Sequence, residues 1–489
     1  MRSRTIFKLL ICTYFLCAIQ ITVAQTKQAE FLLNNSSSIT IDGPHRFVTI
    51  AGITGIHVKS LKTKAFIQTT ALSSEQGSIS LWMSPLEDID KSHNIEGSLI
   101  YPLISDTYPS GIVDSSHFSI YYQGSGYPRL IARFTNGSFW GQMDYGISPF
   151  VYAESLPVKK GEWYHIAVNW DNKDESLKMF INGEMVGHNY SAKAFKKSLN
   201  KLYIGNPLMV ISHLKIQEKL LSPKEIESEY RSKRPSTNQQ ADSIIQTLIH
   251  PVNKGLVKQL DSSWKKTYSC AFNKSSDLEG WTFQTGDKYR DKFNLKVTEK
   301  GLLWETPNII HTESRGYLWC PFQPEGDQCI EFEFQLLSPK GLALLIICAS
   351  GTKGEDIILD QGLRKTGSMS DMNVNYRNYH WEYVRRVEAM RTDVETQYVN
   401  KNPWAKSLFV GCTDRLEQNR WIKIRFMKTG KKLTGYLDGK LIFEVEDNAF
   451  DNNGPVFNSG RIVLRQMYAT SMMYRNFEIY QKNENVAIK

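Results

Sequence analysis

The sequence predicts an all-β protein of two tandem antiparallel β-sandwiches, joined by a polar, partly helical linker. Length carries the first part of this prediction, because 489 residues exceed the roughly 250–300 residues at which one hydrophobic core stops growing. The second part rests on a pattern of short alternating strands and dense turns that occurs twice, with few long helical stretches between.

Each copy of the pattern is a three-strand meander closed by a tight turn. Its strand-like runs are 163–170, 177–181 and 184–186 in the first copy, and 421–427, 433–437 and 440–445 in the second. Asn182-Gly183 and Asp438-Gly439 separate the last two runs of each copy. Such dipeptides indicate type I′ hairpins, because both central residues need a positive φ. Further strand pairs follow, at 201–205 with 211–216 and at 461–466 with 473–479.

A helix start stands out at 221–226, where the sequence reads Leu-Ser-Pro-Lys-Glu-Ile. We expect Ser222 to be the N-cap, with proline at the first helical position and Glu225 closing a capping box. The apolar residues on either side of the cap form a hydrophobic staple. The helix should close the first domain at about Arg231.

The N-terminus has the features of a secretory signal peptide. Cationic residues up to Lys8 precede a mostly apolar run from Leu9 to Ile21, and small residues precede Gln25. We expect the mature protein to be exported, periplasmic or extracellular, and to have no membrane span. The predicted divisions are a signal peptide at 1–24, a first domain at 25–231, a linker at 232–262 and a second domain at 263–489.

The net charge of +9 falls to +6 when Arg2, Arg4 and Lys8 leave with the signal peptide. The remaining excess is too dispersed to indicate a nucleic-acid surface, so we expect no nucleic-acid partner. Aromatic residues make up 12% of the chain, and such rings suit carbohydrate stacking as well as core packing.

Five cysteines remain in the mature chain, all in its second half: Cys270, Cys320, Cys329, Cys348 and Cys412. An odd number without close pairs argues against a zinc module. Cys320 and Cys329, on either side of a Pro-Gly loop, could close a disulfide in an oxidising compartment. The alternative is five buried free thiols.

The first half resembles laminin-G-like, concanavalin A-like jelly rolls over about residues 30–231. Its matching segments are Gly77–Trp82, Gly161–Val168, Phe180–Gly183, Leu202–Asn206 and Ile211–Ile216. Trp82, Trp163 and His165 are expected in the core. The rings of Tyr121, Tyr122, Phe139, Trp140 and Tyr145 are candidates for sugar stacking, with core packing as the alternative. The resemblance implies a fold rather than one function.

The second half resembles the YesU-like family of pectin-associated bacterial proteins over roughly residues 268–481. The matching segments are Asp360–Arg386, Lys401–Pro403 and Asn453–Phe477. The family pattern has an arginine before Lys-Asn-Pro, where this chain has Asn400. The resemblance implies a concanavalin-type jelly roll that accompanies polysaccharide degradation, of rhamnogalacturonan in particular.

The strand at 378–386 has the highest density of aromatic and charged candidate site residues. By alternation, one face would hold Tyr379, Trp381, Tyr383 and Arg385, and the other His380, Glu382, Val384 and Arg386. Glycan recognition needs rings for stacking and charged groups for carboxylates or hydroxyls, and this strand supplies both. The alternative is a structural ionic network on a sheet.

We expect four catalytic residues if the protein cleaves a uronate polysaccharide by elimination. Arg385 and Arg465 would pair with the uronate carboxylate, and His380 or Tyr383 would move the proton. Substrate contacts are predicted at Asp360, Tyr379, Trp381, Lys401, Asn402, Trp404 and Gln466.

Hydrolysis would need two carboxyl groups instead, from Asp356, Asp360 or Glu382. The Glu-x-Asp-x-x-Glu signature of jelly-roll glucanases is absent. The acidic turns at 87–90 and 171–175 could hold Ca²⁺, with plain solvated turns as the alternative. No other cofactor is expected.

These observations predict an exported carbohydrate-active protein that recognises, and as an enzyme would cleave, an acidic pectin-like polysaccharide or oligosaccharide. A lyase reaction is favoured over a glycoside hydrolase reaction. The alternatives are a non-catalytic glycan-binding protein with two lectin-like modules, and a protein whose two domains serve protein assembly.

Overall fold

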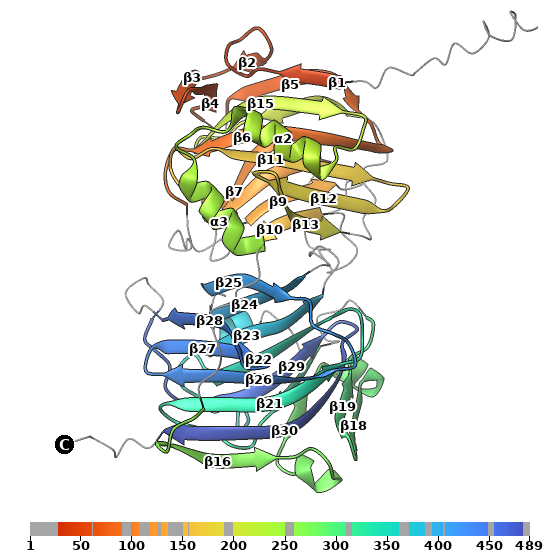
Figure 1. Cartoon of the computed structure of the whole chain (residues 1–489), viewed down its shortest axis with the longest axis vertical. Coiled ribbons are helices and arrows are strands. Elements are labelled where there is room, and N and C mark those ends of the chain that lie inside the picture. The colour runs from red at the N-terminus through yellow and green to blue at the C-terminus, as the bar shows by residue number, and fades with distance from the viewer. Residues whose placement is uncertain are drawn as a thin grey trace, which may run out of the picture.

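The structure is a computed structural model of the whole chain. It describes residues 28–60, 62–89, 99–106, 118–124, 129–134, 150–154, 156–189, 199–249, 259–309, 315–360, 371–386, 394–403, 406–447 and 454–482. Figure 1 shows two β-sandwiches stacked along the long axis of the molecule. The predicted all-β class and tandem arrangement are confirmed.

The first sandwich pairs an eight-stranded with a seven-stranded antiparallel sheet among the described residues. The larger sheet runs in the order β13 (Glu184–Asn189), β12 (Ser176–Ile181), β11 (Tyr164–Asp171), β6 (Gln76–Pro85), β15 (Met209–Gln217), β4 (Ile53–Val58) and β3 (His45–Ile50), with β1 (Gln28–Phe31) beside β15. The smaller runs β10 (Phe150–Glu154), β9 (Arg129–Phe134), β8 (Phe118–Gly124), β7 (Leu99–Ser105), β14 (Leu199–Ile204), β5 (Lys64–Leu72) and β2 (Thr40–Asp42).

The second sandwich repeats this order. Its larger sheet runs β28 (Lys440–Glu446), β27 (Lys432–Leu437), β26 (Trp421–Thr429), β21 (Gln328–Leu336), β30 (Ser471–Lys482), β19 (Gly301–Glu305) and β18 (Asn294–Thr298), with β16 (Trp264–Cys270) beside β30. Its smaller sheet runs β25 (Lys406–Asp414), β24 (Val394–Asn402), β23 (Tyr376–Arg386), β22 (Gly341–Gly351), β29 (Arg461–Met467), β20 (Gly316–Trp319) and β17 (Thr282–Gln284). Short helices are η3 (Ser275–Leu278), η4 (Asp287–Lys292) and η6 (Asp371–Asn375).

Every described strand of the first sandwich therefore has a counterpart at the same place in the second, and the two meanders predicted from the sequence are β11 to β13 and β26 to β28. The meander turns have the predicted backbone: φ is 52° and 88° at Asn182 and Gly183, and 47° and 78° at Asp438 and Gly439. These positive values confirm the type I′ expectation.

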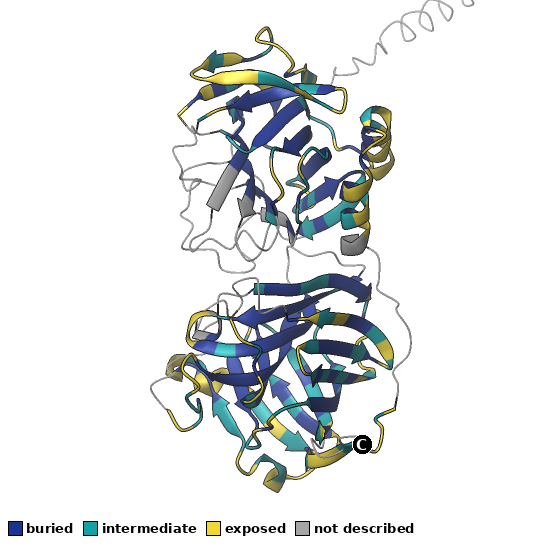
Figure 2. Ribbon diagram, turned by 90° about the vertical axis from the view of Figure 1, so that its left-hand side faces the viewer, coloured by how far each residue is buried: buried dark blue, intermediate teal, exposed yellow. Residues whose placement is uncertain are grey.

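Each sandwich buries its own core between its two sheets, seen in dark blue in Figure 2. Tyr122, one of the candidate stacking rings, lies in the first core, and Tyr121 is also fully buried, while the candidates at 139, 140 and 145 lie outside the described residues. None of the helices in the described part of the chain has the length and apolar character of a membrane span.

Helix α2 (Pro223–Lys233) forms as the capping pattern predicts. The Ser222 side chain accepts a hydrogen bond from the backbone N–H of Glu225, whose carboxylate accepts from the backbone N–H of Ser222. Leu221 and Ile226 lie in one apolar cluster, as expected of a staple. The helix covers the outer face of the larger sheet and turns its exposed side to solvent (Figure 2).

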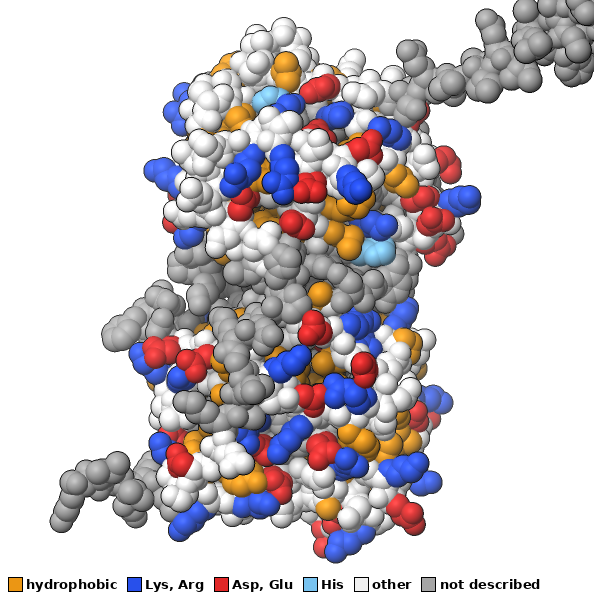
Figure 3. All heavy atoms as spheres, in the orientation of Figure 1, with side chains coloured by type: hydrophobic (Ala, Val, Ile, Leu, Met, Phe, Trp, Pro, Cys, Tyr) orange, Lys and Arg blue, Asp and Glu red, His pale blue; other side chains and the backbone are white. Residues whose placement is uncertain are grey.

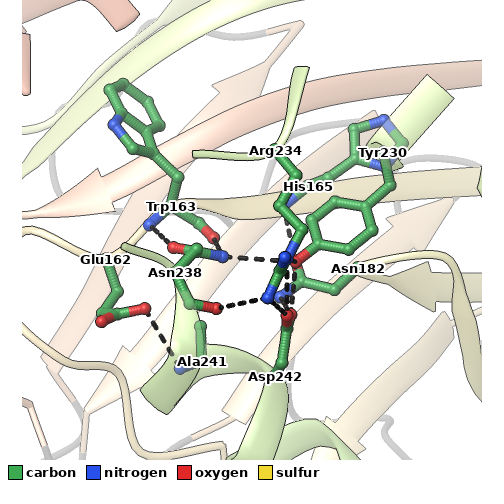
Figure 4. A network of polar contacts seen from close by, with 9 residues as sticks. All are labelled: Glu162, Trp163, His165, Asn182, Tyr230, Arg234, Asn238, Ala241 and Asp242. Carbon is green, nitrogen blue, oxygen red and sulfur yellow. Dashed lines mark hydrogen bonds and ion pairs between the residues drawn. The ribbon is translucent and has the colours of Figure 1, made fainter. Parts of the chain in front are cut away.

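Helix α3 (Gln239–Ile249) lies in the stretch predicted as a linker, and a polar network holds it to the first sandwich (Figure 4). Asp242 accepts hydrogen bonds from Asn182 (3.0 Å) and from Tyr230, and forms an ion pair with Arg234 at 2.6 Å. Asn238 bonds both the N–H and the C=O of Trp163, at 2.7 Å each. Helix α3 also lies against β13 and against β25 of the second sandwich.

The five described cysteines are buried and free, so Cys320 and Cys329 form no disulfide. Cys320 follows β20 of the smaller sheet, whereas Cys329 lies in β21 of the larger one. Burial raises the pKa of Cys320 to about 12 and also raises that of Cys329, which favours the neutral thiol in both.

The outer face of the second sandwich's larger sheet is covered by ion pairs instead of a helix. Basic and acidic side chains intermix there in Figure 3. Lys423 pairs with Glu331 at 2.7 Å, and Arg475 with Glu333 at 2.6 Å. Glu331 is 3% exposed, so its ion pairs hold its carboxylate largely away from solvent.

His165 sits fully buried between two rings on the α2-covered face. Its ring centre lies 5.2 Å from that of Trp82 and 6.3 Å from that of Tyr230, which confirms the core expectation. Within the described residues, neither ring nitrogen has a hydrogen-bond partner. Burial, and then the charges of Lys233 and Lys215, lower the pKa of His165 to about 3.

The depressed pKa of His165 predicts acid sensitivity. Below pH 6.5 the unfolded chain takes up a proton that the folded chain refuses, so the free energy of unfolding should fall by several kcal/mol as the pH drops from 6.5 towards 3. His165→Phe keeps the stacked ring and should remove much of this dependence of the free energy of unfolding on pH. Thermal unfolding of the parent protein and of His165→Phe between pH 7 and 4 measures the dependence. His45→Phe is the control, because His45 is exposed. An unchanged slope in His165→Phe would contradict the prediction.

Candidate functional site

The outer face of the smaller sheet in the second sandwich brings together side chains from five neighbouring strands. One row of directly opposed residues comprises Tyr317, Arg465, Leu344, Glu382 and Tyr398. The next row comprises Trp319, Val463, Ile346, His380 and Asn400. Because opposed residues share a face, these ten side chains form one surface, which we call the site face. The sequence alone could not show that Arg465 and His380 converge here.

A β-bulge decides which side chains of β23 reach the site face. The register of β23 on β22 shifts so that Val384 opposes Ala343 while Glu382 opposes Leu344, which leaves Tyr383 as the extra residue. Tyr383 and Val384 consequently both lie in the core. Arg385 is thereby returned to the side of His380 and Glu382, and Arg386 to the opposite side. The strict alternation expected from the sequence was therefore wrong for Val384, Arg385 and Arg386.

His380 is held between two asparagines. Its Nδ1 lies 3.0 Å from the amide nitrogen of Asn402, which also donates to Asn378 at 3.0 Å, and its Nε2 lies 2.9 Å from the side-chain amide of Asn400. A neutral imidazole has one N–H, so if Asn402 donates to Nδ1, then Nε2 carries the proton. Asn400 then accepts this proton in a hydrogen bond with its amide oxygen, because the oxygen and nitrogen of a side-chain amide are assigned from their hydrogen bonds.

Electrostatics keep His380 neutral and Glu382 ionised. Burial lowers the pKa of His380, and Glu382, whose Oε1 lies 3.6 Å from Nε2, only partly opposes this shift. Burial also acts to raise the pKa of Glu382, but the charge of Arg385, whose Nη1 donates to Glu382 Oε2, and contacts with His380 lower it to about 2. The site face therefore offers a neutral base beside an ion pair.

Each arginine of the site face is stacked on a tyrosine. The guanidinium of Arg385 lies 4.7 Å from the ring centre of Tyr398, and that of Arg465 lies 4.7 Å from the ring centre of Tyr317. All four side chains are at most 5% exposed. Stacking fixes the planes of both guanidinium groups, which suits the two-point binding of a carboxylate.

Several of the predicted site residues point into the core instead. Tyr379, Trp381 and Tyr383 pack between the two sheets, where the hydroxyl of Tyr383 lies 3.2 Å from that of Tyr474 and Trp381 donates to Gln397 at 2.8 Å. Gln466 also turns inwards and donates to Tyr474 at 2.8 Å. None of these side chains lies on the site face.

Lys401 forms an interior ion pair. Its Nζ lies 2.6 Å from Asp447 Oδ2 and also donates to the backbone oxygens of Gly454 (3.2 Å) and Pro455 (2.9 Å). Tyr379 donates to the same carboxylate at 2.5 Å. Burial lowers the pKa of Lys401, against the opposing effect of Asp447. This arrangement ties β24 to the residues that follow β28.

Of the remaining predicted substrate contacts, one lies at the site face. Asn402 lies beside His380, whereas Asp360 is exposed after the turn that begins at Asp356, and Trp404 lies outside the described residues. Asp356 is paired with Arg461 at 2.5 Å, which outweighs burial and lowers its pKa. Because Asp356 and Glu382 are both held ionised, neither suits the protonated acid that hydrolysis needs.

The sequence prediction missed Tyr317, Tyr398 and Asn400. Tyr398 and Asn400 alternate with Asn402, which was predicted, so the two-residue period of a strand contained a signal for them. The family pattern drew attention to Asn400 for lacking an arginine, yet its amide here faces His380. Tyr317 had no local signal, since only the pairing of β20 with β29 sets it under Arg465.

Among the described residues, no group of three or more His, Cys, Asp or Glu side chains is arranged to hold a metal ion. In the acidic turn at 87–90, Asp88 pairs with Lys159 at 3.2 Å, and residue 90 lies outside the described part. In the turn at 171–175, Asp171 accepts backbone N–H groups of the turn itself.

Comparison with known proteins agrees with both resemblances. Residues 265–479 match the family described as a domain of unknown function (DUF1961), and residues 61–227 match the concanavalin A-like lectin/glucanases superfamily. The uncharacterised protein YesU of Bacillus subtilis (strain 168) is 24% identical over 221 residues, which cover 44% of this chain and 94% of that protein.

Similar solved structures each cover less than half of this chain. A protein of unknown function with a galectin-like fold from Bacillus subtilis is 23% identical, with a TM-score of 0.39, and covers 45% of this chain and 98% of its own. The carbohydrate-binding module CBM66 from the same species is 13% identical, with a TM-score of 0.27 and coverage of 41% and 96%. Domain 4 of the arabinanase AbnA from Geobacillus stearothermophilus, solved with arabinotriose, is 16% identical, with a TM-score of 0.29 and coverage of 42% and 98%.

The Lys401–Asp447 pair predicts a structural role for Lys401. Lys401→Met leaves a buried carboxylate without its cation, which should lower the free energy of unfolding by about 3–5 kcal/mol. Lys401→Met combined with Asp447→Asn should lower the free energy of unfolding clearly less, because no uncompensated charge remains. Urea unfolding of both variants gives the comparison. A single variant as stable as the parent protein would show that Lys401 is not needed for the fold.

Proposed function

We propose that the protein is exported and that its second sandwich recognises an acidic polysaccharide on the site face. Two guanidinium groups share that face with a neutral histidine, and each guanidinium is held against a tyrosine ring. This pair of oriented guanidinium groups is the observation that carries the proposal, because planar guanidinium groups suit the two-point binding of a uronate carboxylate.

Arg465 is the arginine that we assign to the ligand. Arg385 forms an ion pair with Glu382, whereas Arg465 lies over the ring of Tyr317 and donates to Met467 Sδ, a weak acceptor. Both side chains are buried, so a ligand must displace the groups that bury them before it reaches the site face. We therefore expect binding to be coupled to a local opening of the structure.

We further propose that His380 supports elimination when the bound sugar is a uronate. In that step Nδ1 of the imidazole, once released by Asn402, takes the proton from the carbon next to the carboxylate. The electron pair of that C–H bond forms a carbon–carbon double bond to the neighbouring carbon, whose bond to the leaving oxygen breaks with its electrons going to the oxygen. The resulting imidazolium returns its proton to the leaving oxygen. Glu382, 3.6 Å away, would stabilise the imidazolium between the two transfers.

Binding without cleavage is the second candidate, and one observation favours it. Tyr383, the other proton-transfer group expected from the sequence, lies in the core against Tyr474. A lyase on this face would thus depend on His380 for both transfers, whereas binding needs only the arginines and the tyrosine rings.

Polygalacturonate and other uronate polysaccharides test the proposal. The purified full chain should be retarded by these polymers in affinity gels, and Arg465→Met should weaken binding about 10- to 100-fold, as expected for a lost charge-assisted hydrogen bond. Arg475→Met is the matched control, because Arg475 is also stacked on a ring (Trp421, 3.9 Å) but lies on the opposite sheet. Equal binding by all three proteins would contradict the role of the site face.

Ultraviolet absorbance of new unsaturated ends, and separately the release of new reducing ends, decide between the two candidates. An eliminase should produce both, and His380→Gln should abolish both while binding persists. Because the pKa of His380 is lowered, its base form persists below pH 6.5, so activity should continue into mildly acidic solution. Binding with neither product would leave the non-catalytic candidate.

A further inference from the structure

The corresponding face of the first sandwich also carries an ordered row of side chains. Directly opposed residues of five neighbouring strands are Phe66, Tyr203, Ser105, Ser119 and Arg133. Their sequence neighbours, such as Ile67, Leu202 and Phe118, lie in the core, so the row lies on the outer face of the sheet. The five strands of this row are the counterparts of the strands that carry Tyr317, Arg465, Leu344, Glu382 and Tyr398 in the second sandwich.

Two half-buried rings and one lysine form the end of this row. The ring centres of Phe66 and Tyr203 lie 5.8 Å apart. The Nζ of Lys201 lies 3.8 Å from the centre of the Phe66 ring and 4.9 Å from that of Tyr203. Unlike the rings of the site face, both aromatic residues are partly open to solvent.

The charge of Lys201 distinguishes this cluster from the cation–ring stack at Trp421. Arg475 lies on Trp421, and its charge is balanced by Glu333 at 2.6 Å. Lys201 has no carboxylate partner in the part of the chain that the structure describes, and the nearby Asp42 stands opposite Lys64 in the strand register. A cation that is held only by rings can exchange that contact for an anion at little cost.

We propose that Phe66, Tyr203 and Lys201 form a second carbohydrate site, which takes an anionic sugar unit. The two rings provide a stacking surface for a pyranose ring, and Lys201 swings off the Phe66 ring to pair with the anionic group of the sugar. The site shares its ligand class with the function proposed above but none of its residues.

Two sites on one chain would act together on a polymer. The second contact becomes intramolecular once the first has formed, so each site should add more to the affinity for a long chain than for a single sugar. The first sandwich would then hold the polymer while the site face binds another part of it. A short oligosaccharide that reaches only one site should show no such gain.

Polygalacturonate and its fully methyl-esterified form are the probes for this site. Phe66→Ala combined with Tyr203→Ala should reduce the affinity of the full chain for polygalacturonate at least tenfold. Lys201→Met should leave binding of the esterified polymer unchanged and reduce the preference for the charged one to the part that the site face contributes. Trp421→Ala is the matched control, because it deletes the ring of the charge-balanced stack on another sheet, and it should bind as the parent protein does.

The outcomes separate this proposal from the function assigned to the site face. If Phe66→Ala/Tyr203→Ala and Lys201→Met bind both polymers as the parent does, the second site is refuted, whatever Arg465→Met does. If they weaken binding while Arg465→Met has no effect, the second site stands and the site-face proposal fails. Circular dichroism and thermal unfolding must show that each variant is folded. A loss of binding by Trp421→Ala equal to that of the ring variant would also overturn the proposal.

Discussion

One extra residue in β23 controls the chemistry of the second sandwich. Without the bulge at Tyr383, alternation would turn Arg385 into the core and Val384 towards the site face. A guanidinium between the two sheets would lack Glu382 and Tyr398 as partners and would be strongly unfavourable. The same insertion that turns Val384 into the core therefore completes the ion pair beside His380. Packing and site composition are set by one local feature.

Burial and the arginine charges together set the protonation of His380 and Glu382. Desolvation opposes charge on both groups, but the guanidinium of Arg385 outweighs it at Glu382, whereas the charges of Arg465 and Arg385 add to it at His380. The result is a neutral base and an ionised acid on one strand. Asn400 and Asn402 cannot supply charge, so they orient the imidazole without altering this balance. An arginine in place of Asn400 would set a third cation against His380 and depress its pKa further.

Local patterns were enough for most of the fold and for part of the site. The Asn-Gly and Asp-Gly turns and the Ser222 cap depend on residues a few positions apart, so the sequence predicted them with the right backbone. The partners of His380 are different, because Arg465 reaches the site face only through the pairing of β29 with β22. A bulge has no fixed sequence signature, so Arg385 was assigned to the wrong face of its strand. Lys401 was misplaced because its partner, Asp447, lies 46 residues away.

The two sandwiches share one strand order but use their outer faces differently. In the first, apolar residues on the larger sheet are covered by α2, and Asp242 holds α3 beside them. In the second, the equivalent face is a lattice of ion pairs, which needs no cover because each charge meets its opposite at the surface. The smaller sheets differ at one end of the row: Phe66 and Tyr203 of the first are partly open to solvent, whereas Tyr317 and Arg465 of the second are fully buried. A polymer therefore reaches the rings of the first sandwich with the movement of Lys201 alone, whereas the site face must first be uncovered. Such an order of events, with capture on Phe66 and Tyr203 before engagement of Arg465, would let binding energy from the open site offset the cost of exposing the buried one.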